Sequence, residues 1–261
     1  MTESTKFIGD IDFAELYFAP VAIDKSRKSV AMYMSAKNTT YNNRVRFQLV
    51  EDEDSPVVSK WNVDTAVEDA DPSRLKQTVL LNSVVHKKTI DKLHELDKMV
   101  QEEAVKKSKE WWKKELPAEA ISYKYKPLIA WDEKSECYAA SYKVIVPHPR
   151  PELGKKYGKE TPIYKISDEG DAVVSDHRIL TQGSEMTPQV STVGVWFMGD
   201  NQFGVSLRAE VLLCKTMVVP SPLDSLKLKR KYREVEAEPA AKKAASGAPP
   251  EPVDEDDEPV M

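Results

Sequence analysis

The stretch that decides the fold is Val195-Trp-Phe-Met-Gly-Asp-Asn-Gln-Phe-Gly-Val-Ser-Leu207. Strand-like residues lead into it from position 190, and an alternating apolar run leaves it over residues 205–217. Its glycines at 199 and 204 are not followed by Lys-Ser or Lys-Thr and lead into a strand, which excludes a phosphate-binding loop. The stretch therefore predicts two strands joined by a turn at 199–204. Three aromatic residues that flank this turn are read mainly as core positions: Trp196, Phe197 and Phe203.

Short runs of alternating apolar residues recur through the rest of the first 217 residues. In residues 44–50, Val45, Phe47 and Leu49 alternate with polar side chains, as in a strand with one buried face. Further strands are predicted at residues 29–36, 61–67, 75–81, 137–146, 162–166 and 172–174. A long, basic, proline-containing loop interrupts them at residues 147–159. This pattern is typical of a mainly β protein.

Residues 87–116 follow a different period. Apolar residues recur there at spacings of three and four, and neither Gly nor Pro occurs before Pro117. We expect one long amphipathic helix, whose mixed charges form a solvated face. Strands with one inserted helix predict an OB-fold-like Greek-key barrel with additional strands.

The net charge of −5 is unevenly distributed along the 261 residues. Residues 234–261 hold nine acids and two lysines, whereas residues 1–233 have a net charge of +2. The last segment is rich in Ala, Pro, Lys and Gly and cannot pack a core. We therefore predict an OB-fold-like nucleic-acid-binding domain at 1–233 and a disordered acidic tail at 234–261.

Several function classes lose support from composition. Two distant cysteines and four scattered histidines provide neither a disulfide framework nor the ligand spacing of a metal site. No nucleophile or kinase motif is present, so we expect no enzyme activity and no cofactor. The first residues are polar and no long apolar run occurs, which predicts an intracellular, non-secreted protein without a membrane segment.

Aromatic residues interleaved with bases are the clearest functional signal. Exposed rings can stack on nucleic-acid bases, while lysine and arginine neutralise phosphates. The predicted nucleic-acid-binding residues are Lys124, Tyr125, Lys126, Tyr138, Tyr142, Lys143, Arg150, Lys155, Lys156, Tyr157 and Lys159. Tyr138 and Tyr142 share one strand face and have core positions as their alternative interpretation. Tyr125 and Tyr157 are the preferred stacking candidates.

Two charged segments lie at the end of the chain. Residues 227–233 hold five bases, which can contact phosphates, act as a nuclear-import signal or dock the acidic tip. The tip is acidic with an apolar end, and its predicted partner-binding residues are Asp254, Glu255, Asp256, Asp257, Glu258, Val260 and Met261. A tethered acidic segment can occupy a nearby basic groove until DNA displaces it.

In combination, the β-rich body, the internal helix, residues 195–207 and the acidic tail resemble the podovirus-type single-stranded DNA-binding proteins, which have counterparts in nucleocytoplasmic large DNA viruses. The resemblance implies an OB-fold body and a tail that competes with DNA and recruits replication proteins such as a polymerase, helicase or primase. Phage members end on an aromatic residue, whereas this chain ends Val260-Met261. If the protein is viral, it is expected in the host nucleus or at a cytoplasmic replication site.

The leading hypothesis is non-catalytic, sequence-independent binding of single-stranded DNA in viral-type replication, recombination or repair, with a homodimer as one option. The alternative is a virion or scaffold protein whose tail keeps it soluble. A histone-chaperone-like protein is disfavoured because the acids concentrate in the tail. Stacking and phosphate neutralisation serve DNA and RNA alike, so both ligands stay open.

Overall fold

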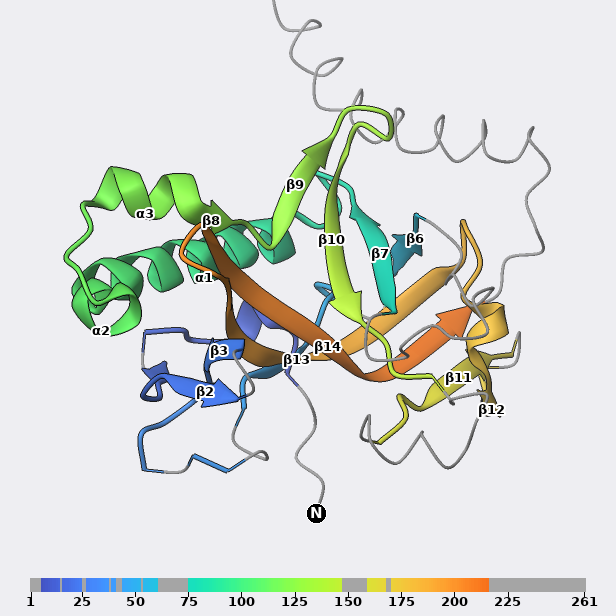
Figure 1. Cartoon of the computed structure of the whole chain (residues 1–261). Coiled ribbons are helices and arrows are strands. Elements are labelled where there is room, and N and C mark those ends of the chain that lie inside the picture. Colours follow the sequence, from blue (N-terminus) through green and yellow to red (C-terminus); the bar gives the residue numbers. More distant parts are fainter. Residues whose placement is uncertain are drawn as a thin grey trace, which may run out of the picture. The chain divides into compact units, whose positions relative to one another are not determined.

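A computed structural model describes residues 6–14, 16–24, 27–37, 39–40, 44–52, 54–60, 75–146, 159–167 and 170–215 (Figure 1). Several predictions lie outside these residues: the strand at 61–67, most of the loop at 147–159, the basic run at 227–233 and the acidic tail. The domain boundary at residue 233 stays a prediction for the same reason.

A long antiparallel hairpin crosses the body and carries most of the other strands. Its strands are β13 (Glu185–Met198) and β14 (Gln202–Lys215), and they pair along their whole length. The turn occupies only residues 199–201, with Gly199 in the left-handed region at φ 57°. The two predicted strands are confirmed, but the turn is shorter than predicted because residues 202–204 already belong to β14.

Three shorter strands close this hairpin into a five-stranded barrel: β6 (Val57–Ser59), β7 (Lys76–Leu81) and β10 (Cys137–Lys143). β7 pairs antiparallel with both β6 and β10, β10 pairs parallel with β14, and β6 returns to β13. Around the barrel the strands therefore follow the order β6, β7, β10, β14 and β13. The last two are exchanged relative to their order in the chain, and β10 and β14 are parallel. This Greek-key order confirms the predicted OB-fold-like barrel.

The additional strands extend the two edges of the hairpin. Along β13 lie β5 (Arg46–Gln48) and β3 (Arg27–Val30), which pairs in turn with β2 (Ala22–Asp24). Along β14 lie β8 (Tyr125–Lys126) and β11 (Ile163–Ile166), which pairs with β12 (Ala172–Ser175). β9 (Ile129–Asp132) pairs with β10, and β1 (Tyr17–Phe18) pairs separately with β4 (Met32–Tyr33). Short 3-10 helices lie at Ile8–Asp10 and His177–Ile179.

The helical segment is divided, and the prediction of one helix over 87–116 is wrong in this respect. α1 (Lys87–Lys106) is followed by α2 (Ser108–Trp112), and α3 (Ala118–Lys124) starts after Pro117. α2 ends where Lys113 adopts a left-handed conformation at φ 62°. Since Trp111 and Trp112 are consecutive and both buried, a single regular apolar stripe cannot accommodate them, and the helix breaks near them.

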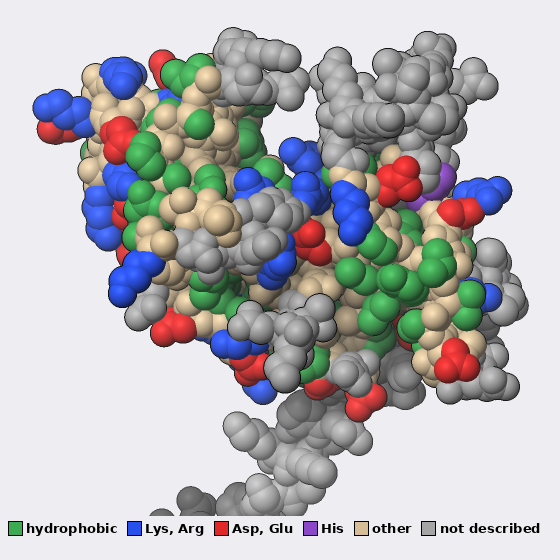
Figure 2. All heavy atoms as spheres, turned by 90° about the horizontal axis from the view of Figure 1, so that it is seen from below, with side chains coloured by type: hydrophobic (Ala, Val, Ile, Leu, Met, Phe, Trp, Pro, Cys, Tyr) green, Lys and Arg blue, Asp and Glu red, His purple; other side chains and the backbone are tan. Residues whose placement is uncertain are grey.

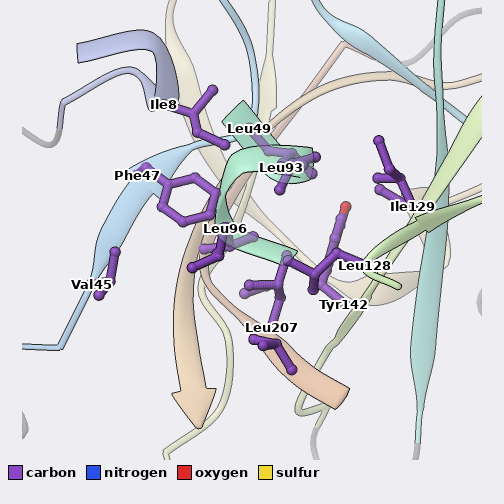
Figure 3. Packing of buried hydrophobic residues seen from close by; sticks show 14 of the residues in the cluster. Ile8, Val45, Phe47, Leu49, Leu93, Leu96, Leu128, Ile129, Tyr142 and Leu207 are labelled. Atoms are coloured by element: carbon purple, nitrogen blue, oxygen red, sulfur yellow. The ribbon is translucent and has the colours of Figure 1, made fainter. Parts of the chain in front are cut away.

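The apolar stripe of α1 packs against the barrel. Figure 3 shows Leu93 and Leu96 of α1 near Phe47 of β5 and near Leu49, which directly follows β5, and all four are fully buried. A second part of the core lies under the hairpin turn, where the rings of Trp112 and Phe203 are 5.0 Å apart. Within the described residues, no helix is long and apolar enough to cross a membrane.

Candidate nucleic-acid interface

Two of the predicted stacking residues are core residues. Tyr125 is 6% exposed, donates its hydroxyl to Asp97 Oδ1 at 2.5 Å and packs against Phe203 at 5.1 Å between ring centroids. Tyr142 is 1% exposed, and its hydroxyl lies 3.1 Å from Met186 Sδ. Burial raises the pKa of both phenols. The prediction that these rings stack on bases is wrong, because Tyr125 of β8 packs against Asp97 of α1 and Phe203. Tyr142 lies on the buried face of β10, as its alternative interpretation as a core residue has it.

Tyr138 shares the inner face of β10 with Tyr142, as their spacing predicts. It is half-buried and forms edge contacts with Trp131 at 5.2 Å and His94 of α1 at 5.7 Å. Its alternative interpretation as a packing residue therefore describes it better. Lys143 belongs to the same strand but lies on its outer face, because it is an odd number of residues from Tyr138.

The predicted lysines have different positions. Lys126 of β8 is exposed, and Lys124 donates from Nζ to the carbonyl oxygen of Asp200 at 2.5 Å. Lys159 is exposed before β11. Arg150, Lys155, Lys156 and Tyr157 lie outside the described residues, as do the tail residues from Asp254 to Met261. Of the predicted set, the structure places Lys126 and Lys143 together on the outer face.

Strand register aligns four cations across five strands of this outer face. Arg46 of β5 is the Cα partner of Ser191, Ser191 of Arg208, Arg208 of Lys143, and Lys143 of Lys76. Partners in a sheet place their side chains on the same side, about 5 Å from the next strand. We call Arg46, Arg208, Lys143 and Lys76 the cation row. Its strands run in the order β5, β13, β14, β10 and β7.

The carboxylate of Glu210 lies next to the cation row. Glu210 Oε1 accepts from Arg208 Nη2 at 3.1 Å and from the hydroxyl of Ser191. This ion pair holds the Arg208 side chain at the surface of the cation row. Figure 2 shows Lys and Arg side chains gathered near the middle of the face that looks downward in Figure 1. Such a concentration of positive charge attracts a polyanion.

A second row on the same face carries an aromatic ring. Ser29, Trp196, Gly204 and Lys126 are successive Cα partners across β3, β13, β14 and β8. A Cβ added to Gly204 would lie 3.1 Å from Cζ2 of Trp196, so the indole lies over this glycine. The indole N–H donates to the carbonyl of Val205 at 3.2 Å. Trp196 is therefore a partly buried ring with a fixed orientation.

Small residues separate the two rows. Gly194 and Ser206 are Cα partners between them, and the hydroxyls of Thr78 and Ser141 are hydrogen-bonded at 2.9 Å on the neighbouring strands. Arg208 and Gly204 are four residues apart on β14, which places the rows about 13 Å from each other. The surface thus offers cations at one side and a flat aromatic ring at the other.

Sequence reasoning missed three cations and the ring: Arg46, Lys76, Arg208 and Trp196. The alternation in residues 44–50 already shows that Arg46 lies opposite a buried face. The register that brings these residues together joins segments up to 162 positions apart and leaves no signal in a single sequence. The sequence interpretation treats the three rings that flank the turn as mainly core, but only Phe197 and Phe203 pack against the helices.

Other chemistry has little support on the described residues. Within the ranges that the structure covers, no group of three or more His, Cys, Asp or Glu side chains is arranged to hold a metal ion. Asp97 is a buried carboxylate that accepts hydrogen bonds from the backbone N–H of Leu128 at 3.0 Å and from the Tyr125 hydroxyl. It has a structural role under β8.

No family model matches the chain, and no curated protein matches it. Three similar solved structures are phage proteins. The single-stranded DNA-binding protein from bacteriophage Enc34, truncated at its C-terminus, has 9% identity and a TM-score of 0.41 over 78% of this chain and 98% of its own. The same phage protein in complex with single-stranded DNA has 10% identity and a TM-score of 0.39 over 78% and 97%. The gp2.5 single-stranded DNA-binding protein of bacteriophage T7 has 12% identity and a TM-score of 0.44 over 68% and 90%.

Proposed function

We propose that this protein binds single-stranded DNA without catalysis and without sequence preference, through the cation row and Trp196. The observation that carries the proposal is the register: Arg46, Arg208, Lys143 and Lys76 occupy partnered positions on one barrel face. Trp196 lies on that same face over Gly204. Phosphates and bases of one strand can therefore be bound together.

The binding mechanism follows from these two rows. Lysine and arginine replace counterions at the phosphates, which makes affinity depend strongly on salt. A base stacked on Trp196 contributes about 1–3 kcal/mol, whichever base it is, because every base has a π-face. A duplex keeps its bases stacked internally and cannot use the ring, so single strands are preferred.

The test is fluorescence anisotropy of a labelled oligo(dT) of about 30 nucleotides, which exceeds the usual site of one OB domain. The full chain is measured at several salt concentrations with duplex DNA and oligo(U) as competitors. We expect salt-sensitive binding that duplex competes poorly. Equal competition by oligo(U) would broaden the ligand to single-stranded nucleic acid. No binding at low salt would overturn the proposal and favour the virion or scaffold protein.

The acidic tail is proposed to regulate this binding and to recruit a polymerase, helicase or primase. Asp254–Glu258 are five consecutive acids, and a tethered segment has a high effective concentration at the basic face. A chain ending at Arg233 should bind oligo(dT) more tightly than the full chain, most clearly at low salt. Equal affinities across the salt series would refute competition by the tail.

The cellular role is proposed to be DNA replication, recombination or repair, with the protein at an intracellular replication site. The basic run Lys227-Leu-Lys-Arg-Lys-Tyr-Arg233 is a candidate nuclear-import signal. A fluorescent fusion in which Lys229, Arg230 and Lys231 are replaced by alanine should lose nuclear accumulation. Sedimentation of the full chain tests the homodimer.

A further inference from the structure

Tyr123 is an aromatic side chain whose exposure packing does not explain. It is 91% exposed on α3, although the same helix buries Ile121 completely. Two residues along a helix correspond to a rotation of about 200°, so Tyr123 points away from the face that holds Ile121. The fold therefore does not need this ring.

Two contacts hold the end of α3 beside the hairpin turn. Lys124 Nζ donates to the carbonyl oxygen of Asp200 in the turn, and Lys126 pairs with Gly204 at the start of β14. Figure 1 shows the end of α3 and β8 beside this end of β14. Three peptide spans separate Tyr123 from Lys126, so their Cα atoms are at most about 11 Å apart. Since Gly204 lies under Trp196, Tyr123 is close to the proposed interface.

The surroundings of Tyr123 favour a nucleic acid over an apolar peptide. Lys124 and Lys126 follow it directly. The ammonium of Lys28 lies beside the turn, 4.4 Å from the ring centroid of Phe197, and its pKa is lowered mainly by burial and further by nearby Lys113. Asp200 offsets part of this charge. Cations crowded at the turn can neutralise phosphates of a strand that leaves the sheet here.

We propose that Tyr123 is a second stacking site for a base of single-stranded DNA, beyond Trp196. This inference rests on the proposed function and extends the path of the bound DNA strand. The strand crosses the cation row and Trp196, passes Lys126 and reaches α3. The hydrogen bond from Lys124 to Asp200 anchors the backbone at the end of α3, so stacking there orders only the side-chain torsions of Tyr123.

The test compares Tyr123→Ala with Tyr123→Phe, because phenylalanine keeps the ring and removes only the hydroxyl. Affinity is measured by anisotropy for oligo(dT) of about 6 nucleotides, near the lower end of the site sizes of OB domains, and of about 20 nucleotides, above their upper end. We expect Tyr123→Ala to weaken binding of the long oligonucleotide by at least about fivefold. Tyr123→Phe should bind it like the unchanged protein. The short oligonucleotide, which prefers the cation row and Trp196, should lose less affinity.

The outcomes separate this inference from the proposed function. Trp196→Ala is the reference, since it removes the ring on the barrel face itself. If the unchanged protein binds and Trp196→Ala weakens binding, equal affinity of Tyr123→Ala and Tyr123→Phe for the long oligonucleotide overturns the inference alone. If the unchanged protein does not bind oligo(dT), both the proposed function and this inference are wrong. Unfolding midpoints of both variants should equal that of the unchanged protein because the ring is exposed.

Discussion

Lys143 of β10 and Arg208 of β14 are Cα partners at the position where these two parallel strands pair and close the barrel. Closing the fold therefore brings two cations side by side. Like charges on partnered positions repel, and Glu210 forms an ion pair with Arg208 at 3.1 Å beside them. A bound phosphate would attract both cations, so the same backbone pairing serves the fold and the candidate interface.

Replacing Lys143 by alanine should weaken binding of oligo(dT) and reduce its dependence on salt. If Lys143 contacts one phosphate, the slope of log affinity against log salt should fall by about 0.7. Anisotropy at four salt concentrations measures both quantities. Lys98→Ala is the matched control, because Lys98 is an exposed lysine of α1 that pairs with Glu102 at 3.9 Å. A Lys143→Ala chain with the affinity and slope of Lys98→Ala would contradict the assignment of the cation row.

Gly204→Ala should disturb the row of Ser29, Trp196, Gly204 and Lys126 by steric overlap, without any change in charge. The added Cβ would lie 2.7 Å from the carbonyl oxygen of Lys126 and 3.1 Å from the indole, so β8 or the ring must move. We expect a loss of about 1–3 kcal/mol in the free energy of unfolding and weaker binding of oligo(dT). Urea denaturation and anisotropy measure these effects. Gly9→Ala is the control, since a Cβ there meets nothing within 4 Å, and equal behaviour of the two variants would disprove the close packing.

The sequence predicts the barrel better than it predicts the site, and residues 44–50 show why. Alternation along one strand assigns Arg46 to the outer face and Phe47 to the core, because side chains in a strand point to opposite faces. It does not determine which other strands lie beside Arg46. The cation row depends on long-range register, which follows from how the whole barrel packs.

The prediction that buried tyrosines stack on bases is wrong for a related reason. In the sequence, one basic and aromatic cluster is formed by Lys124, Tyr125 and Lys126. In the structure, Tyr125 points inward to Asp97 whereas Lys126 points outward. Asp97 is 28 positions away, and its burial on an otherwise charged helix cannot be seen in the sequence. The helix prediction fails locally at Trp111 and Trp112, where two adjacent large rings must both be buried.

Tyr142 provides a test that separates stability from binding. Tyr142→Ala should lower the free energy of unfolding by about 3–5 kcal/mol, because a fully buried aromatic ring is lost. Tyr142→Phe keeps the ring, removes the hydroxyl next to Met186 and should bind oligo(dT) like the unchanged protein. Urea denaturation and anisotropy measure the two properties. Weaker binding by a stably folded Tyr142→Phe chain would return this residue to the interface.

Asp97 should make the stability of the protein depend on pH. Burial raises the pKa of this carboxyl from 3.8 to about 6, while the hydrogen bonds from Tyr125 and Leu128 partly oppose the shift. The folded protein therefore holds the proton more tightly than the unfolded chain. Its stabilising contribution is fully present below pH 4 and is lost as the pH rises through 6. The shift corresponds to about 3 kcal/mol between these limits.

The comparison of Asp97→Asn with the unchanged protein isolates this effect. Asparagine has nearly the shape of the protonated acid but does not titrate, so the difference in unfolding free energy between the two chains should change between pH 4 and pH 7. Buried His86 has a lowered pKa and contributes with the opposite sign, but it is present in both chains and cancels. Urea denaturation at pH 4.5, 5.5, 6.5 and 7.5 supplies the measurement. A constant difference across this series would mean that Asp97 keeps one protonation state. Its hydrogen bonds with Tyr125 and Leu128 would then contribute the same stability at every pH tested.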